Sequence, residues 1–85
     1  MAAAEQYQLF KTDTCGFCYR VRSFLQEKNI QVPVRDINQD QEAFRELLAG
    51  GGRSMVPCLR IESSDGGVTW MYESMDIMNY LASKH

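Results

Sequence analysis

The sequence predicts an α/β fold, a four-stranded mixed sheet flanked by helices in the order β-α-β-α-β-β-α. Three observations predict it. Short apolar strands alternate with segments of helical periodicity, a turn rich in Ser, Asp and Gly joins two late strands, and a stripe of apolar residues at helical spacing follows them. With 85 residues, the chain is expected to form one domain over residues 1–85, since a second core would have no room.

The first half of the chain supplies a β-α-β unit. A strand is predicted at Gln6–Phe10 and a helix at about Gly16–Lys28, with Asn29 as its stop. Four apolar residues at helical spacing define the inward face of this helix: Phe17, Val21, Phe24 and Leu25. Three more suggest a second strand, which Pro33 places near a sheet edge: Val32, Val34 and Ile37.

The middle of the chain predicts a second helix and a hairpin. Asp40 is expected to cap a helix that runs to about Ala49 and ends at Gly50-Gly51-Gly52. Its inward residues are expected to be Phe44, Leu47 and Leu48. Strands at Cys58–Glu62 and Val68–Tyr72 should then form the hairpin, because the five residues from Ser63 to Gly67 favour a turn.

The last element is predicted to be a helix. Ser74 is expected to cap it, and Asp76 in its first turn suits the helix dipole. Its inward stripe is expected to be Ile77, Met78 and Leu81.

Composition argues against several classes of protein. The net charge is −2 and the chain has no basic run, so non-specific nucleic-acid binding is not expected. No stretch approaches the roughly 18–20 apolar residues of a membrane span, and the first residues lack the pattern of a secretory signal. Three cysteines are an odd number for a disulfide framework. We therefore expect a cytoplasmic monomer without membrane partners.

Cys15-Gly16-Phe17-Cys18 is the motif that carries chemistry. It follows a predicted strand and opens a predicted helix, the context of a thiol–disulfide redox pair. The helix N-terminus favours a thiolate, and Cys15 should be the more exposed of the two thiols, so Cys15 is the candidate nucleophile and Cys18 the resolving thiol. Lys11 and Arg53 are nearby cations that could hold a thiolate or an anionic thiol substrate.

Two alternatives to redox chemistry stay open for this pair. It could be structurally inert, or it could be half of a zinc site, for which Cys58 and His85 would be the remaining candidate ligands. Cys58 itself is expected to be a small buried apolar residue.

Two further motifs suggest a binding surface. A cis bond at Val56-Pro57 would leave the Val56 backbone free to pair with an extended ligand, whereas a trans proline would simply start an edge strand. Glu73-Ser74, at the start of the last helix, could bind a carboxylate or could merely cap the helix.

Together these motifs resemble those of glutaredoxins, from Tyr7 to about Leu81. The resemblance rests on three segments in the right order: Cys15-Gly16-Phe17-Cys18, Arg53-Ser54-Met55-Val56-Pro57 and Tyr72-Glu73-Ser74-Met75-Asp76-Ile77. It implies a thioredoxin-like fold and a glutathione-dependent oxidoreductase that reduces protein–glutathione mixed disulfides and small disulfides. Its expected partners are glutathione, as co-substrate, and glutathionylated or disulfide-containing proteins.

The resemblance also implies roles for individual residues. Cys15 would attack and Cys18 would resolve, while Val56, before a proline that is cis in the family, would pair with the cysteinyl part of glutathione. Lys11 and Arg53 match positions that approach the glycine carboxylate. The expected glutathione-binding residues are Lys11, Phe17, Arg53, Met55, Val56, Pro57, Glu73 and Ser74.

The chain departs from the usual glutaredoxin pattern at two places. Glu73-Ser74 is closer to the amino-terminal domain of glutathione transferases, where this pair holds the γ-glutamyl group. A full transferase is not expected, because no helical carboxy-terminal domain follows. Gly16 replaces a common proline, and some relatives without that proline bind a [2Fe–2S] cluster between two subunits. A cluster held by two Cys15 thiolates and two glutathiones is therefore one alternative, and a thioredoxin-like reductase is another. No other metal is expected.

Overall fold

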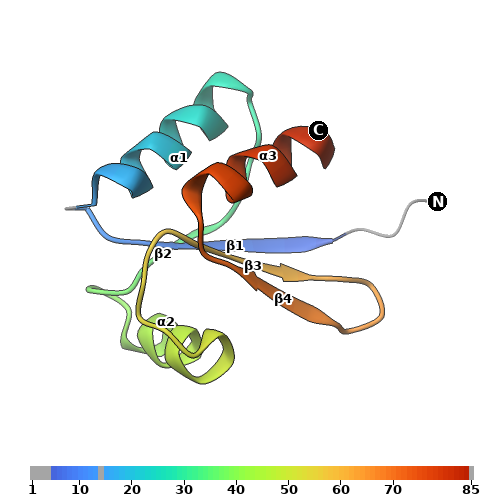
Figure 1. The fold of residues 1–85 in the computed structure, drawn as a ribbon. Helices are drawn as coiled ribbons and strands as arrows, with labels where there is room; N and C mark the ends of the chain where they lie inside the picture. Colours follow the sequence, from blue (N-terminus) through green and yellow to red (C-terminus); the bar gives the residue numbers. More distant parts are fainter. Residues whose placement is uncertain (1–4, 14, 85) are drawn as a thin grey trace.

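The elements of the computed structural model, which describes residues 5–13 and 15–84, follow the predicted order (Figure 1). They are β1 (Gln6–Lys11), α1 (Gly16–Glu27), β2 (Val34–Asp36), α2 (Gln41–Glu46), a π-helical turn η1 (Leu47–Gly51), β3 (Cys58–Glu62), β4 (Val68–Met71) and α3 (Ser74–Lys84). The strands form one mixed sheet in the order β2-β1-β3-β4. The predicted thioredoxin-like architecture is confirmed.

The sheet combines one parallel pair with two antiparallel pairs. β2 runs parallel to β1, with Leu9 opposite Val34. β3 runs antiparallel to β1 and places Cys58 opposite Phe10, while β4 pairs antiparallel with β3. The end of β1 and the beginning of β3 therefore lie side by side.

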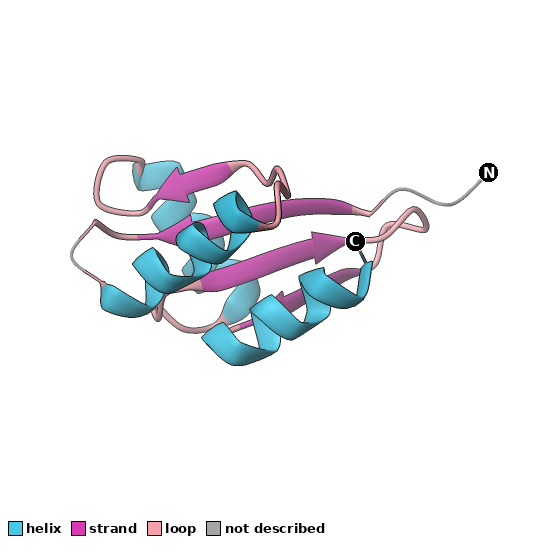
Figure 2. Ribbon diagram, turned by 90° about the horizontal axis from the view of Figure 1, so that it is seen from above, coloured by secondary structure: helices cyan, strands magenta, loops and turns pink. Residues whose placement is uncertain are grey.

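Helices cover both faces of the sheet, with α1 and α3 on one face and α2 on the other (Figures 1 and 2). Side chains of successive strand residues point to opposite faces, so Leu9 and Phe10 belong to different cores. Leu9 lies in the core under α1 and α3: Leu9, Val21, Leu25, Ile30, Leu59, Ile61, Ile77 and Leu81. Phe10 lies in the core under α2: Phe10, Ala43, Leu47 and Cys58.

The predicted helix boundaries have clear local causes. Asp40 caps α2, because its Oδ1 accepts a hydrogen bond from the Ala43 N–H at 3.2 Å. Asn29 adopts a left-handed conformation with φ 57°, which ends α1 as predicted. The Ile30 N–H then returns to the Leu25 carbonyl at 2.9 Å.

Several predicted details are wrong. Phe44 and Leu48 are exposed rather than inward, because α2 and η1 present Ala43 and Leu47 to the sheet and each next residue lies about 100° around the helix axis. Phe17 is exposed for the same reason, beside the buried Cys18.

The boundaries of the later elements also shift. The second helix was expected to reach Ala49 as an α-helix, but its last turn is π-helical. α3 includes Ser74 as its first residue, and Glu73 precedes the helix, since the Ile77 N–H bonds to the Glu73 carbonyl at 2.9 Å. Met78 is half-buried against the core, next to the buried Ile77 and Leu81. Within the described residues, no helix has the length and apolar character to span a membrane.

We predict that Ile77→Ala lowers the free energy of unfolding by about 2–5 kcal/mol, because it leaves a cavity in the core under α1 and α3. Urea denaturation followed by circular dichroism would measure the change. Met75→Ala, on the exposed side of the same helix, is the matched control and should change stability little. Equal effects of the two substitutions would contradict the assigned core.

Candidate active site

The candidate site lies where β1 leads into α1. Cys15 is the N-cap of α1, with an extended backbone at φ −96° and ψ 119°, and Cys18 is one turn inside the helix. The start of α1 and the loop that leads into β3 lie at the same edge of the sheet (Figure 1). Two segments distant in sequence therefore meet at Cys15.

A direct contact joins these two segments. The Cys15 thiol donates to the Val56 carbonyl oxygen, with the sulfur 3.7 Å from that oxygen. The Val56-Pro57 bond is cis, in agreement with the glutaredoxin resemblance. Pro57 is buried and Val56 is half-buried. The backbone of Val56 thus lies beside the candidate nucleophile.

The local environment favours the thiolate of Cys15. Burial raises the pKa of this thiol, but hydrogen bonds from the Cys18 backbone N–H, the Cys18 thiol and the Phe17 backbone N–H outweigh burial, and the pKa lies below its ordinary value. Unpaired N–H groups in the first turn of a helix are the expected donors to such a thiolate.

Cys18 has the opposite character. Its side chain is 1% exposed, and burial raises the pKa of its thiol to about 11, with the hydrogen bond to Cys15 adding to the rise. The Thr12 backbone and the charge of Lys11 act against this rise without cancelling it. Cys15 is half-buried, so the prediction that Cys15 is the more exposed thiol is confirmed.

Lys11 is held by carboxylates of its own chain. Its ammonium group lies 2.5 Å from Asp13 and 3.2 Å from Asp36, and its side chain is 12% exposed. The hydrogen bond to Asp13 is the main reason why the pKa of Lys11 is raised. An anionic ligand would have to compete with both carboxylates for this cation, a constraint that the sequence did not reveal.

Arg53 and Met55 lie on the exposed loop before Val56. The Arg53 guanidinium carbon is 5.7 Å from the centroid of the Tyr72 ring, and the Arg53 carbonyl accepts a hydrogen bond from the Tyr72 hydroxyl at 3.4 Å. Met55 is 52% exposed and Phe17 is 60% exposed. These side chains are therefore accessible to a ligand.

Glu73 and Ser74 lie between β4 and the first turn of α3. Glu73 is exposed and Ser74 is half-buried. Tyr72, the residue before them, contacts Arg53. The third predicted motif is thus joined to the second through Tyr72.

The zinc alternative finds no support in the part of the chain that the structure describes. Within residues 5–13 and 15–84, no group of three or more His, Cys, Asp or Glu side chains is placed to bind a metal. His85 lies outside the described residues. Cys58 is fully buried, as predicted, and burial raises the pKa of its thiol to about 12.

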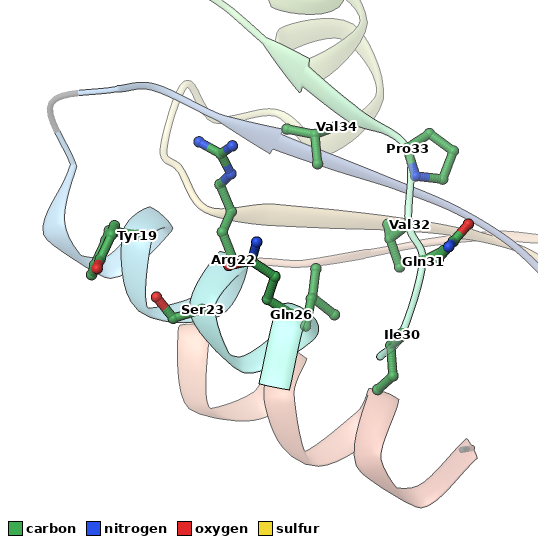
Figure 3. A pocket seen from close by; sticks show the side chains of 10 residues that line it. Tyr19, Arg22, Ser23, Gln26, Ile30, Gln31, Val32, Pro33 and Val34 are labelled. Carbon is green, nitrogen blue, oxygen red and sulfur yellow. The ribbon is translucent and has the colours of Figure 1, made fainter. Parts of the chain in front are cut away.

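A separate cavity of about 760 Å³ lies between α1 and the segment that leads into β2. Tyr19, Arg22, Ser23 and Gln26 of α1 face residues 30–34 across it (Figure 3). The described residues that line it include no cysteine and no carboxylate, so this cavity is separate from the thiol pair.

Tyr72 and the Thr12 backbone were not among the predicted site residues, although both contact site residues. Tyr72 begins the third motif of the glutaredoxin resemblance, directly before Glu73, and this position was the signal in the sequence that could have indicated a role. No side-chain pattern could have indicated the backbone contact of Thr12.

Comparison with known proteins identifies the family. Residues 14–84 match the model of the glutathione S-transferase N-terminal domain. The chain belongs to this family. A search of curated proteins found no match.

Solved structures resemble this glutathione S-transferase N-terminal domain along most of its length. Maleylacetoacetate isomerase from Anaeromyxobacter dehalogenans, with dicarboxyethyl glutathione and citrate in its active site, is 26% identical with a TM-score of 0.71. The match covers 99% of this chain but only 39% of the isomerase chain.

Two smaller proteins share the fold. The thioredoxin-like protein BC3987 is 22% identical with a TM-score of 0.68, over 87% of this chain and 97% of that chain. Glutaredoxin from Brucella melitensis is 16% identical with a TM-score of 0.57, over 93% of this chain and 79% of that chain.

We predict that Cys15 is alkylated by iodoacetamide at lower pH than Cys18, and that Cys18→Ala raises the pKa of Cys15 because the thiolate loses a hydrogen-bond donor. Mass spectrometry of each cysteine peptide across a pH series would measure both effects. Cys58→Ala removes a thiol that is not among the groups acting on Cys15 and should leave the Cys15 pKa unchanged. Faster alkylation of Cys18 would contradict the assigned roles.

Proposed function

We propose that this domain is a glutathione-dependent thiol–disulfide oxidoreductase of the glutaredoxin type. The observation that carries the proposal is the thiol of Cys15, the N-cap residue of α1, which has a lowered pKa and lies 3.7 Å from the Val56 carbonyl oxygen. A reactive thiolate beside the backbone of a loop segment is suited to a substrate that is both a thiol and a peptide. Glutathione is such a substrate.

The proposed reaction begins at the sulfur of Cys15. The Cys15 thiolate attacks the glutathione sulfur of a protein–glutathione disulfide, a new sulfur–sulfur bond joins Cys15 to glutathione, and the protein leaves as a thiolate that takes a proton. A second glutathione thiolate then attacks the bound glutathione sulfur. Oxidised glutathione leaves and the Cys15 thiolate is restored.

Cys18 offers a second way to release Cys15. As a thiolate, Cys18 would attack the Cys15 sulfur, expel reduced glutathione and form a Cys15–Cys18 disulfide. The raised pKa of Cys18 keeps its thiol protonated at neutral pH. The glutathione route should therefore be faster for small mixed disulfides.

The binding residues are proposed from position and chemistry. The Val56 backbone would pair with the cysteinyl part of glutathione, with Pro57 fixing its direction. Arg53 is exposed and could pair with the glycine carboxylate, whereas Lys11 would first have to leave Asp13 and Asp36. Glu73 and Ser74 would hold the γ-glutamyl end, and the exposed Phe17 and Met55 would contact the body of the peptide.

A glutathione transferase or isomerase activity is the second candidate, because the family match and the glutathione-bound isomerase favour it. The chain spans 39% of the isomerase, so that protein's whole activity is not carried over. The [2Fe–2S] cluster expected as an alternative would use Cys15 from each of two chains. The comparisons do not support it, and we do not include it in the proposal.

We predict that Cys15→Ser abolishes reduction of a glutathionylated peptide in a glutathione-coupled assay, because a serine hydroxyl is not ionised at neutral pH and cannot replace the thiolate. Cys18→Ser should retain substantial activity, since glutathione can release Cys15 directly. Activity retained in Cys15→Ser, together with conjugation of an electrophile to glutathione, would favour the transferase instead.

We predict that Ser74→Ala weakens the binding of S-methylglutathione by about 3- to 10-fold, the effect of losing one or two hydrogen bonds. Isothermal titration calorimetry would measure it, and the methylated thiol prevents disulfide formation. Ser83→Ala lies near the other end of α3 and is the control, since its hydroxyl bonds to the Tyr80 carbonyl. Equal affinities for both variants would argue against a ligand role for Ser74.

A further inference from the structure

Tyr72 lies between the two segments that would bind glutathione, and the proposed reaction gives it no role. It follows β4 directly, precedes Glu73-Ser74, and contacts the loop that ends at Val56. We propose that Tyr72 is a positioning residue that fixes the Arg53–Val56 segment beside Cys15. This inference rests on the proposed function for its effect on catalysis, but the contacts that carry it are structural.

The first contact is with Arg53. The Tyr72 hydroxyl donates to the Arg53 carbonyl at 3.4 Å, which is long for a hydrogen bond between oxygen atoms and contributes little alone. The Arg53 guanidinium lies 5.7 Å from the Tyr72 ring centroid, within the range of a cation–π interaction. The ring therefore holds the charged end of Arg53, and the hydroxyl adds a weak contact with its backbone.

The second contact is with Gly51, the last residue of η1. A Cβ atom on Gly51 would overlap the Tyr72 hydroxyl oxygen, and a Cβ on Gly50 would overlap the Trp70 ring. The chain can approach these two rings this closely only because both residues lack a side chain. Gly52 follows with φ 82° and turns the chain toward Arg53.

The third contact is through the core under α2. Tyr72 and Val56 both pack against this cluster, which contains Phe10 and Cys58. Val56 in turn accepts the hydrogen bond from Cys15. A displaced Tyr72 ring would therefore move the Val56 carbonyl relative to Cys15. The ring acts on Cys15 only through the Arg53–Val56 segment.

The test uses two substitutions, of which Tyr72→Phe should suppress most of the effect of Gly51→Ala. Tyr72→Phe removes the hydroxyl and should raise the KM for a glutathionylated peptide about threefold with kcat nearly unchanged. Gly51→Ala should raise KM more, about tenfold, because its methyl group displaces the Tyr72 hydroxyl. In the double variant the oxygen is gone and the nearest remaining ring atom lies 3.0 Å from the added methyl group, a contact that a small shift relieves. KM should therefore fall back toward the Tyr72→Phe value.

Amide hydrogen exchange of residues 53–56 gives a readout that does not depend on catalysis. Exchange there should be faster in both single variants, most of all in Gly51→Ala, and in the double variant it should return toward the Tyr72→Phe rate. Tyr80→Phe is the matched control: its hydroxyl bonds to Glu5 at 2.7 Å, so its loss should affect stability but neither KM nor exchange at residues 53–56.

The outcomes separate the two proposals. Unchanged exchange at residues 53–56 in Tyr72→Phe and Gly51→Ala overturns the positioning role, whatever the activity. A lower melting temperature with unchanged KM and exchange also overturns it, because that result describes a purely structural tyrosine. A wild-type protein that does not reduce the glutathionylated peptide overturns the proposed function, while the exchange data still decide the role of Tyr72.

Discussion

The antiparallel pairing of β1 with β3 is the constraint on which the site depends. With Phe10 opposite Cys58, β1 leaves the sheet beside the point where β3 enters it. The chain after β1 reaches Cys15, and the chain before β3 contains Val56. Strand pairing therefore places the Cys15 thiol beside the Val56 carbonyl oxygen. A slip of one residue would exchange the faces of Leu59 and Cys58 and disrupt both cores.

Burial then separates the chemistry of the two thiols. Both cysteines lie in the first turn of one helix, yet the pKa of Cys15 is lowered and that of Cys18 is raised to about 11. The difference comes from position: Cys18 is buried, whereas Cys15 is the half-buried N-cap residue, where the N–H groups of Phe17 and Cys18 help to lower its pKa. The proposed nucleophile is the thiol with the lowered pKa, and the thiol beside it stays protonated at neutral pH.

Local signals in the sequence were sufficient for most of the fold. Asp40 and Asn29 set helix ends through their own side-chain and backbone preferences, and β3 was predicted with its observed bounds. The cysteine motif also gave the asymmetry of its two thiols. These features depend on residues close together in the chain, so the local spacing of residue types was enough to predict them.

What could not be predicted depends on contacts between distant segments. The ion pair between Lys11 and Asp36 forms only because β1 and β2 pair, and it engages a cation that the resemblance to glutaredoxins implied for glutathione binding. The exposure of Phe44 and Leu48 follows from the orientation of α2 and η1 against the sheet. The approach of Gly51 to Tyr72 joins residues far apart in the chain, and no periodicity indicates it.

The unequal size of the two cores has a consequence for how the protein opens. Among residues 5–13 and 15–84, eight buried residues form the core under α1 and α3, but four form the core under α2. Segments with less buried apolar surface open locally at lower free-energy cost. The helix that carries the thiols belongs to the stronger layer, whereas Val56 packs on the weaker one. Partial unfolding should therefore loosen the Val56 segment, proposed to bind glutathione, before the helix that carries Cys15 and Cys18. Loss of the proposed binding edge and loss of the thiol pair would then be separate events.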